Sequence, residues 1–556
     1  MQEKIASIVP LLAPAVLLIF SFIILISRNK DFAKRDQILQ YLSVFGLLVS
    51  LVSAITVFQY GTLQSGLIGW EGLGLALRLD PLSITMLTMI SLLGLIVLRF
   101  SKNYLAGDPR KWVFMIRLAT TIASVELLVL SGNLGQLFIF WVITSVCLHY
   151  LLVFYRSRPQ AIAAARKKFV VARLGDVSLF AATLLIYNAL GTGNLEEIFA
   201  AIQNMGTLTT PLIWATVLLV FTAILKSAQF PTHGWLIEVV ETPTPVSALL
   251  HAGLLNAGPF LMVRMGFLMV ESTPASLMLI IIGGFTALFA SVVFLTQPSV
   301  KVALGYSSIA HMGFSLLICG FGVHTAAILH VVAHSFYKAH AFLSSGSVVD
   351  IVRSRKMTVP SRVGSLGRIT LSILSALGIY VLFCYMWGVK PEEDFNLMAT
   401  GAIIVLGLSQ VIVSTVDSKG SLSAVVQSGV IAFIVALSFF SLEHGAHLLL
   451  ASQLPVSATP SMAIKWAAST LIAIYAITVF IQLISPRLKP GDFGYRLGVH
   501  LRNGLYVNVI FDRIIGSLKH EKFKWANLEV KEGKAEWEDS PAYQAEPKTS
   551  EQYINN

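Results

Sequence analysis

The chain has 556 residues, of which 55% are hydrophobic and only 12% are charged, and its mean hydropathy is +0.76. This composition lies far outside the usual mixture of a soluble domain and excludes that class. The formal net charge of +11 would suit a nucleic-acid-binding protein, but the basic residues sit in alternate loops of an apolar chain. We therefore expect a membrane protein with no nucleic-acid partner.

Apolar windows of roughly 18 to 23 residues recur from the N-terminus to about residue 485, and each is long enough to cross a hydrocarbon core of ~30 Å. They predict an all-α polytopic membrane protein with about fifteen transmembrane helices (14 to 16). The predicted starts are Ala6, Tyr41, Pro81, Trp112, Leu134, Phe169, Pro211, Pro245, Ala275, Lys301, His324, Arg368, Asn396, Leu422 and Ala463. A transmembrane β-barrel would show segments of about ten residues with alternating polarity, and the chain has none. The first apolar run leads into a basic loop, so we expect no cleavable signal.

Lysine and arginine follow the first, third, fifth and eleventh predicted helices, whereas the even-numbered loops hold almost none. These basic residues are Arg28, Lys30, Lys34, Arg35, Arg99, Lys102, Arg110, Lys111, Arg156, Arg158, Arg166, Lys167, Lys168, Arg353, Arg355, Lys356 and Arg362. By the positive-inside rule, we expect the N-terminus outside and the C-terminus in the cytoplasm.

The chain divides into one membrane domain and a different C-terminal part. We expect residues 1–486 to form the transmembrane domain, and residues 487–518 to form an amphipathic cytoplasmic segment at the membrane surface or against a partner. Residues 519–556 are charged and poor in aliphatic side chains, which predicts a flexible polar cytoplasmic tail. Cys147, Cys319 and Cys384 lie in apolar runs without CxxC spacing, so no disulfide, iron–sulfur or zinc-ribbon site is expected.

Ionisable side chains inside the predicted helices are the candidates for function. Each costs a few kcal/mol or more in hydrocarbon, so such residues usually face the bundle interior, a partner or a water-filled cavity. They are Glu126, Arg173, Asp176, Lys226, His251, His311, His330, His334 and Lys338.

His330, His334 and Lys338 follow one another at steps of four residues, which places them in one stripe along a helix, whereas His340 falls on another face. Two imidazoles and an amine in such a stripe can pass protons, because histidine titrates near neutrality and burial lowers the proton affinity of lysine. The histidine pair could also bind zinc, although no third ligand falls at a motif spacing. The remaining alternative is a set of polar side chains hydrogen-bonded across helices.

Lys226 lies five residues before Pro231 in the stretch "AILKSAQFPTHGW". Pro231 has no amide hydrogen and its ring clashes with the carbonyl of Ser227, which predicts a break just past the lysine. Pro243 and Pro245 follow, and they leave a short segment between two breaks. Because a broken helix at membrane depth must line a cavity or be buried in protein, we interpret Lys226 as a relay or ion-binding residue. A lysine that snorkels to the interface is the alternative.

The segment "LKSAQFPTHGWLIEVVETPTPVSALLHAG" resembles the hallmark of the antiporter-like subunits of complex I and of Mrp-type cation/proton antiporters. "VKVALGYSSIAHMGF", "LHVVAHSFYKAHAFLSSGSV", "LRLDPLSITML" and "RLGD" are similar to other blocks of that family. The resemblance covers roughly residues 70 to 350. It implies two inverted five-helix repeats with broken helices, and a central polar axis that conducts protons. The residues to which it assigns that role are Lys226, His251, His330, His334 and Lys338, with His311 as a weaker candidate.

The chain departs from the family's respiratory members at two places. Their fifth helix carries a glutamate in a W-E-G segment, but the fifth helix here, "FIFWVITSVCLHYLLVF", has no acid. A "WEGLG" at residues 70–74 lies in the loop before the third helix, and we interpret it as a coincidence. Glu126, one helix earlier, is a candidate for the substitute carboxylate. The twelfth helix lacks the family's internal proline, and Lys390 is a weak candidate for that helix's lysine.

A chain with the lysine and histidine axis but without the respiratory glutamate looks most like the membrane subunit of Dab-type inorganic-carbon pumps. The resemblance implies a bacterial inner (plasma) membrane location and a partner, a large peripheral subunit of the DabA type with a β-carbonic-anhydrase-like zinc site. That partner would hydrate CO2, and this chain would supply proton or cation flux without a cofactor and without being an enzyme itself. The alternatives are a proton-pumping subunit of a complex I-like NADH/quinone oxidoreductase, a component of a Mrp-type antiporter, and an anchor that conducts nothing.

Overall fold

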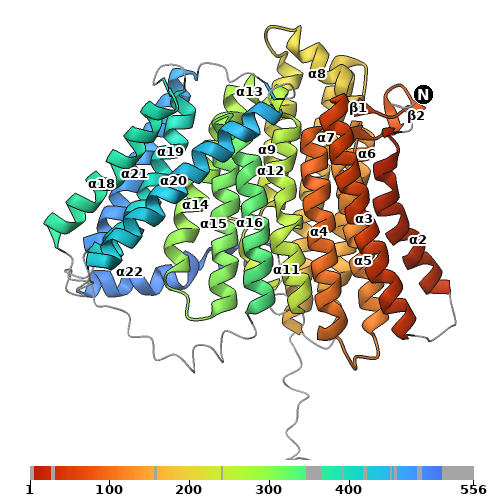
Figure 1. Cartoon of the computed structure of the whole chain (residues 1–556), viewed down its shortest axis with the longest axis horizontal. Helices are drawn as coiled ribbons and strands as arrows, with labels where there is room; N and C mark the ends of the chain where they lie inside the picture. Colours follow the sequence, from red (N-terminus) through yellow and green to blue (C-terminus); the bar gives the residue numbers. More distant parts are fainter. Residues whose placement is uncertain are drawn as a thin grey trace, which may run out of the picture.

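The computed structural model describes residues 6–26, 32–155, 159–239, 242–345, 365–390, 394–416, 422–450, 454–455, 460–484 and 491–515. Long helices run roughly side by side through the molecule (Figure 1). In the first half they are α2 (Leu12–Ile26), α3 (Phe32–Tyr60), α4 (Pro81–Tyr104), α5 (Lys111–Val129), α6 (Leu134–Leu152), α7 (Pro159–Leu190), α9 (Thr210–Lys226), α11 (Thr244–Ala252) and α12 (Ala257–Arg264). They continue with α14 (Thr273–Phe294), α15 (Val300–Gly320), α16 (His324–Ser344), α18 (Leu366–Met386), α19 (Phe395–Val416), α20 (Leu422–Leu450) and α21 (Met462–Ile484).

The helical membrane fold is confirmed. In the part of the chain that the structure describes, 12 helices are long and apolar enough to cross a membrane. Fourteen of the fifteen predicted starts lie at or inside a helix of the structure, and the first, Ala6, lies before α2. Helices α9, α16 and α19 are not among those 12. The count of fifteen crossings therefore stays a prediction.

Two predicted helix starts are wrong by about a helical turn or more. Helices α3 and α7, which correspond to the second and sixth predicted helices, begin at Phe32 and Pro159, well before the predicted Tyr41 and Phe169. As a result Lys167, which we assigned to a loop with Lys168, lies inside α7, and both side chains are buried. A hydropathy window ends at charged residues, whereas the helix continues because neighbouring helices supply partners for the two ammonium groups.

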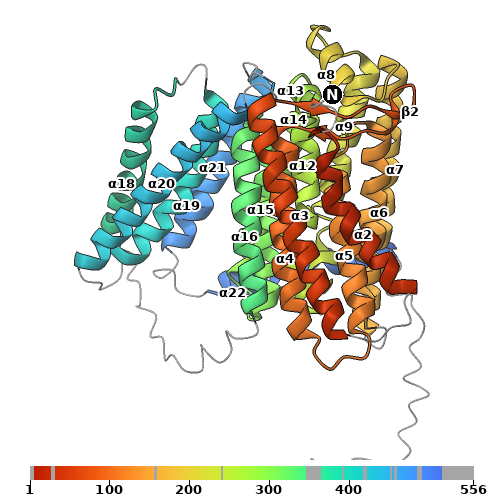
Figure 2. The same ribbon diagram turned by 45° about the vertical axis from the view of Figure 1, so that its right-hand side comes forward.

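The helices form two groups. Residues from Leu17 to Phe342 share one continuous hydrophobic core, which also takes in a few side chains of α19 and α21. Helices α18 to α21 have three small cores of their own, and they join the main bundle where α21 meets α14 and α20 meets α16. Figure 2 shows them as a separate group beside α15 and α16.

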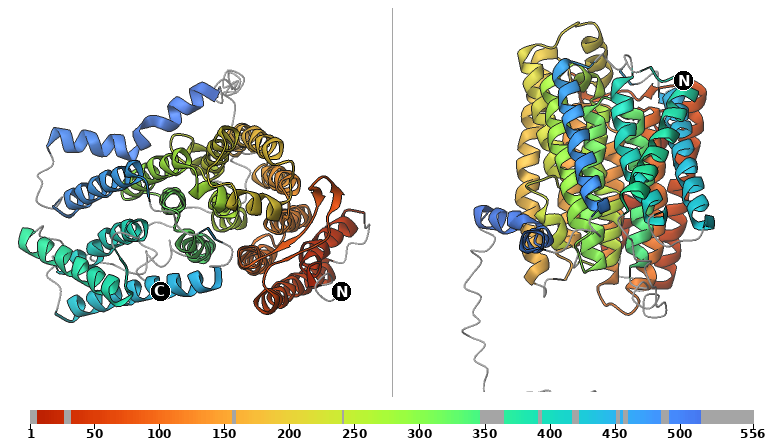
Figure 3. Two further views of the ribbon diagram at one scale, coloured as in Figure 1. Left: turned by 90° about the horizontal axis from the view of Figure 1, so that it is seen from above. Right: turned by 90° about the vertical axis from the view of Figure 1, so that its left-hand side faces the viewer.

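The two ends of the bundle differ. At one end lie two small antiparallel sheets of two strands each, together with α8 (Leu195–Gln203). The hairpin of β2 (Ile68–Trp70) and β3 (Leu73–Leu75) lies in the chain between the paired strands β1 (Leu63–Gln64) and β4 (Arg78–Leu79), and we call this end of the bundle the hairpin end. At the other end α22 (Asp492–Arg502) lies crosswise, as Figures 1 and 3 show. The basic residues between α4 and α5 are at this second end, because α4 starts next to the hairpins. Which end faces the cytoplasm stays a prediction from the positive-inside rule.

Asp80 fastens the hairpin end to the core. Its carboxylate caps α4 by accepting a 2.7 Å hydrogen bond from the amide of Ser83, and Pro81 occupies the first helical position. The same carboxylate forms ion pairs with Arg78, at 2.8 Å, and with Arg264 at the end of α12. All three charged side chains are buried. The pairs therefore join the start of α4 to the end of α12.

We expect Asp80→Asn to lower the free energy of unfolding by about 3–5 kcal/mol, because it leaves the buried Arg264 without its counter-charge. The loss is measured as a lower melting temperature of the protein in detergent. Glu196→Gln, on the exposed first turn of α8, is the control and should melt like the wild type. Equal melting temperatures for the two variants would contradict the structural role of Asp80.

Candidate functional site

The predicted break after Lys226 is confirmed. Helix α9 ends at Lys226, and the next helix, α10 (Gly234–Glu238), is only 5 residues long. Side chains satisfy the backbone groups that the break exposes: Gln229 Nε2 donates to the carbonyl of Ser227 at 2.8 Å, and Ser227 Oγ donates to the carbonyl of Leu255 at 2.9 Å. The break is therefore buried in protein, as a discontinuity at membrane depth must be.

A second break faces the first. Helix α11 ends at Ala252, and the 3-10 turn η3 (Leu254–Asn256) leads into α12. A Cβ added at Gly258 would lie 2.1 Å from Ser227 Oγ, so only glycine allows α12 this close to the end of α9. Asn256 Nδ2 donates to Ser335 Oγ of α16 at 2.7 Å. The turn η3 thus lies between the end of α9 and α16.

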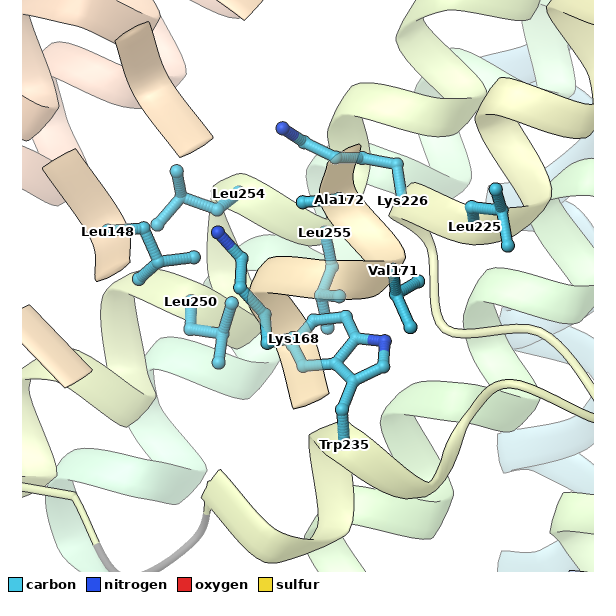
Figure 4. A pocket seen from close by; sticks show the side chains of 10 residues that line it. All are labelled: Leu148, Lys168, Val171, Ala172, Leu225, Lys226, Trp235, Leu250, Leu254 and Leu255. Atoms are coloured by element: carbon cyan, nitrogen blue, oxygen red, sulfur yellow. The ribbon is translucent and has the colours of Figure 1, made fainter. Parts of the chain in front are cut away.

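Lys226 lies against an aromatic ring and a second lysine. Its Nζ is 4.5 Å from the centroid of the Trp141 ring on α6, within the range of a cation–π contact. Lys226 and Lys168 line one small cavity of about 20 Å³, enough for about one water molecule. Figure 4 shows both side chains extending toward the side on which Leu254 lies. Lys168 Nζ donates to the carbonyl and to Oγ of Ser145, at 2.7 and 3.0 Å.

Asp176 on α7 lies one helical turn after Ala172, which lines the same cavity as Lys226. Asp176 also pairs with Arg173 at 2.6 Å on the same helix. Glu126 is buried on α5, where it accepts a 2.8 Å hydrogen bond from Ser91 Oγ. Among the contacts of the described residues, none joins Glu126 to Lys226. The substitute role of Glu126 stays a prediction, and Asp176 becomes a second candidate for the partner of Lys226.

The "WEGLG" stretch forms the turn between β2 and β3. Trp70 is 76% exposed, and Glu71 accepts a 3.1 Å hydrogen bond from the hydroxyl of Tyr187. The turn lies at the hairpin end of the bundle (Figure 1), where it supports α7 from outside the core. These contacts place its glutamate away from Lys226, in agreement with our interpretation of the motif as a coincidence.

Three histidines from α15 and α16 meet in the second half of the main bundle. His311 Nδ1 lies 3.2 Å from His330 Nε2, and the ring centroid of His334 is 5.0 Å from that of His311. The rings of His330 and His334 are nearly parallel with centroids 6.2 Å apart, as residues four apart on one helix face should be. His340 is exposed on another face. The predicted stripe therefore exists, and His311 joins it.

Lys338 and His251 extend this cluster. The Lys338 side chain is completely buried, and its Nζ donates to the carbonyl of Leu304 at 3.1 Å. Lys338 follows His334 by four residues and so lies one turn further along the same face of α16. The ring of His251 stacks on Phe342 at 4.2 Å.

The predicted site residues thus fall into two groups, and two others, Glu126 and Lys390, lie outside them. His251, His311, His330, His334 and Lys338 form one cluster, whereas Lys226 belongs to another with Lys168, Asp176 and Arg173. The turn η3 lies between the groups, since Leu254 lines the lysine cavity and Asn256 bonds to α16. Lys390 lies beyond the unbroken helix α18 in an exposed position, where its backbone amide donates to Asp394.

The described residues contain no group of three or more histidine, cysteine, aspartate or glutamate side chains that could hold a metal ion. His334 and His251 each have both ring nitrogens buried without a hydrogen-bond partner. Unpaired buried imidazoles are costly unless water or a moving proton visits them.

Sequence analysis missed two side chains that contact the Lys226 site. Lys168 falls in a predicted basic loop, and Trp141 falls in the apolar run of the predicted fifth helix. No pattern in the sequence identifies either of them, because Trp141 meets Lys226 from a helix about 85 positions away in the chain. Ser145, one turn after Trp141 on the same face of α6, gives a weak signal in retrospect.

Comparisons with known proteins agree with this geometry. Residues 131–388 match the family model "NADH:quinone oxidoreductase/Mrp antiporter, TM", and residues 72–115 match "NADH-Ubiquinone oxidoreductase (complex I), chain 5 N-terminus". The chain is 34% identical over 518 residues to "Probable inorganic carbon transporter subunit DabB2" of Halothiobacillus neapolitanus, covering 91% of this chain and 93% of that protein.

Two further similarities are more partial. "Probable inorganic carbon transporter subunit DabB" of Hydrogenovibrio crunogenus is 38% identical over 320 residues, which cover 57% of this chain and 60% of that protein. The fold resembles that in the structure of the Mrp complex from Dietzia sp. DQ12-45-1b, with a TM-score of 0.54 and 21% identity, covering 95% of this chain and 57% of that one. At this identity the structural likeness shows the fold alone.

We expect the Trp141 ring and the Lys226 ammonium group to be coupled by about 0.5–2 kcal/mol, the usual strength of a cation–π contact. A double-mutant cycle with Trp141→Leu and Lys226→Met, measured as free energies of unfolding in detergent, gives this coupling directly. Trp214→Leu, at a ring that is 61% exposed, is the control and should show no coupling to Lys226. Additive losses for the first pair would mean that Lys226 is uncharged or does not meet the ring.

Proposed function

Because the chain belongs to the complex I/Mrp antiporter-like family of membrane subunits, close to the DabB type, we propose that it carries the ion flux of an inorganic-carbon uptake complex. It is a transporter-class membrane subunit. The proposed flux of protons or of another cation drives the uptake of CO2 or bicarbonate. The observation that supports this proposal is the buried polar axis of two clusters on either side of η3.

The histidine cluster has the geometry that proton transfer requires. A neutral imidazole has one nitrogen that donates and one that accepts, so the 3.2 Å contact between His311 and His330 can pass a proton when the two rings exchange tautomers. His334 lies next to both rings, and the buried Lys338 supplies a second basic group on the same helix face. We propose that these groups, with His251, carry the proton through the second half of the main bundle.

The lysine cluster provides the entry half of the proposed path. Lys226 and Lys168 share one cavity, with Asp176 nearby to balance their charge. Because like charges at close range disfavour each other, a proton that arrives at one lysine favours loss of a proton from the other. The broken backbone at η3 places carbonyl groups, such as that of Leu255, beside the end of α9.

We further propose that the partner is a large peripheral subunit of the DabA type with a β-carbonic-anhydrase-like zinc site. It would convert CO2 and water to bicarbonate and a proton on the cytoplasmic side of the bacterial inner membrane, with this chain's N-terminus outside. Zinc would supply the hydroxide for hydration. The similarity to subunits named as inorganic carbon transporters supports this choice of partner.

Two other functions compete with carbon uptake, because the matching family models also describe complex I and Mrp subunits. A complex I-like proton-pumping subunit should co-purify with quinone-reducing subunits. A Mrp-type antiporter component should confer salt tolerance on a sensitive host. Both observations are independent of carbon uptake, so either one would favour its own function in place of carbon uptake.

Co-expression of this chain with its candidate partner should restore growth in air to a cell that lacks carbonic anhydrase. We expect His334→Ala or Lys338→Ala to abolish this rescue, because each removes a buried basic group from the proposed path. His340→Ala, on the exposed face of the same helix, is the matched control and should grow like the wild type. Rescue by the two path variants with normal complex assembly would favour an anchor that conducts nothing.

Asp176→Asn and Glu126→Gln separate the two candidate carboxylates. We expect Asp176→Asn to lower ion-coupled uptake at least tenfold, because it removes the negative charge one turn from the part of α7 that lines the Lys226 cavity. We expect Glu126→Gln to keep most of the wild-type uptake, since Glu126 bonds to Ser91 and not to Lys226. The reverse result would identify Glu126 as the carboxylate that the path needs.

A further inference from the structure

Helix α23 (Val507–Ile515) contacts α7 and α10, two helices beside the lysine cluster. The centre of the contact is Lys167 of α7, whose side chain is 1% exposed. Its Nζ lies 2.5 Å from Glu238 Oε1 of α10, donates to Asn508 Oδ1 at 3.0 Å, and forms an ion pair with Asp512. Asn508 Nδ2 in turn donates to the same Glu238 oxygen at 2.6 Å. One closed network therefore joins α7, α10 and α23, and we call it the α23 clamp.

Two glycines let the C-terminal segment approach closely. A Cβ added at Gly234, the first residue of α10, would lie 1.7 Å from Asn508 Oδ1. A Cβ added at Gly504, whose φ is +59°, would lie 2.7 Å from the hydroxyl of Tyr306 on α15. A side chain at position 234 would displace the Asn508 amide from its place in the clamp, and one at position 504 would be strained by the positive φ. The segment is thus fitted against α10 and against α15, which carries His311.

The α23 clamp lies next to the lysine cluster through both α7 and α10. Lys167 and Lys168 are successive residues of α7, so their side chains point about 100° apart around the helix. Lys167 reaches the clamp, whereas Lys168 reaches the cavity of Lys226. On α10, Glu238 bonds to the clamp and Trp235 lines that cavity.

Helix α10 needs outside contacts to keep its place. It has 5 residues between two breaks, and a helix of this length is not stable by itself. Its one acidic side chain, Glu238, bonds through Oε1 to Lys167 and to Asn508 of the clamp. Charged hydrogen bonds are stronger and more directional than neutral ones, so the clamp restricts both the position and the rotation of α10.

We propose that Asp512 and Asn508 are positioning residues that act through Lys167 and Glu238 to hold α10, and with it the Lys226 cavity, in the geometry that ion translocation needs. The effect on ion translocation rests on the proposed function, whereas the contacts of the α23 clamp do not. The C-terminal segment is then a working part of the ion path, although it lies outside the bundle. Its path to the cavity is short: α23 to Glu238, and Glu238 to Trp235 on the same helix.

Two measurements on the full chain with its partner test the proposal. The first is hydrogen exchange of the amides of α10. We expect Asp512→Asn to speed this exchange on the order of tenfold through local opening, and Asn508→Ala to change it in the same direction by less. Arg513→Gln removes a charge from the exposed side of the same helix and should leave the exchange unchanged. Exchange in α14 reports on the rest of the bundle and should be the same in all variants.

The second measurement is the rate of inorganic-carbon uptake. We expect Asp512→Asn to lower the maximal rate several-fold without changing the substrate concentration at half-maximal rate, and Asp512→Glu to restore most of it. A helix that merely adds stability would reduce the amount of assembled complex and leave the rate per complex unchanged.

The outcomes separate this inference from the proposed function. Suppose that the wild type takes up inorganic carbon, and that Asp512→Asn has the same hydrogen exchange and the same uptake rate as the wild type. This result would overturn the inference about α23 but not the proposed function. No uptake by the wild type would overturn the proposed function, and the exchange data would still decide whether α23 holds α10. Equal effects of Asp512→Asn and Arg513→Gln would also overturn the inference, because only the first residue belongs to the α23 clamp.

Discussion

The break between α9 and α10 is the feature on which the rest of the site depends. In hydrocarbon, a carbonyl or amide group without a partner costs several kcal/mol, so a helix can stop in mid-membrane only where protein surrounds it. Ser227, Gln229 and the close approach of Gly258 provide that surrounding here. Because the break is satisfied from within, Lys226 can end its helix beside a cavity instead of extending toward solvent.

A second consequence is the separation of the polar residues into two clusters. The lysine cluster is held by α6, α7 and α9, and the histidine cluster by α11, α15 and α16. Turn η3 lies between them, and its flanking helices are interrupted in the same region as α9. Two discontinuous helices that face each other thus place polar backbone groups between the clusters. Close packing requires a glycine here, since a Cβ at Gly258 would lie 2.1 Å from Ser227 Oγ.

The α23 clamp shows how a segment outside the bundle can influence its interior. Figure 3 shows the C-terminal helices along one side of the bundle and crosswise to its long helices. Their polar residues reach α7 and α10, while Gly504 lies against Tyr306 on α15. The predicted amphipathic segment is therefore not only a surface element. Its Asp512 and Asn508 side chains bond to Lys167 of α7, a helix that lines the Lys226 cavity.

Much of this protein could be predicted from its sequence, because hydrocarbon imposes strict rules on single segments. Apolar length determines the helices, Pro231 determines the break after Lys226, and steps of four determine the stripe of His330, His334 and Lys338. Each of these depends on residues close together in the chain, and the structure agrees with all three. The starts of α3 and α7 were missed, because hydropathy alone does not detect charged turns that continue a helix.

Only the tertiary structure decided which polar groups meet. Trp141 and Lys168 contact the Lys226 site, Asp176 lies one turn from the part of α7 that lines the same cavity, and Lys167 bonds to Asp512 some 345 positions later. No local periodicity encodes such pairings, since a charge inside a membrane helix must find a partner but does not specify which helix provides it. The sequence by itself thus determined that buried charges exist and on which helix faces they lie, and the packing of the helices selected their partners.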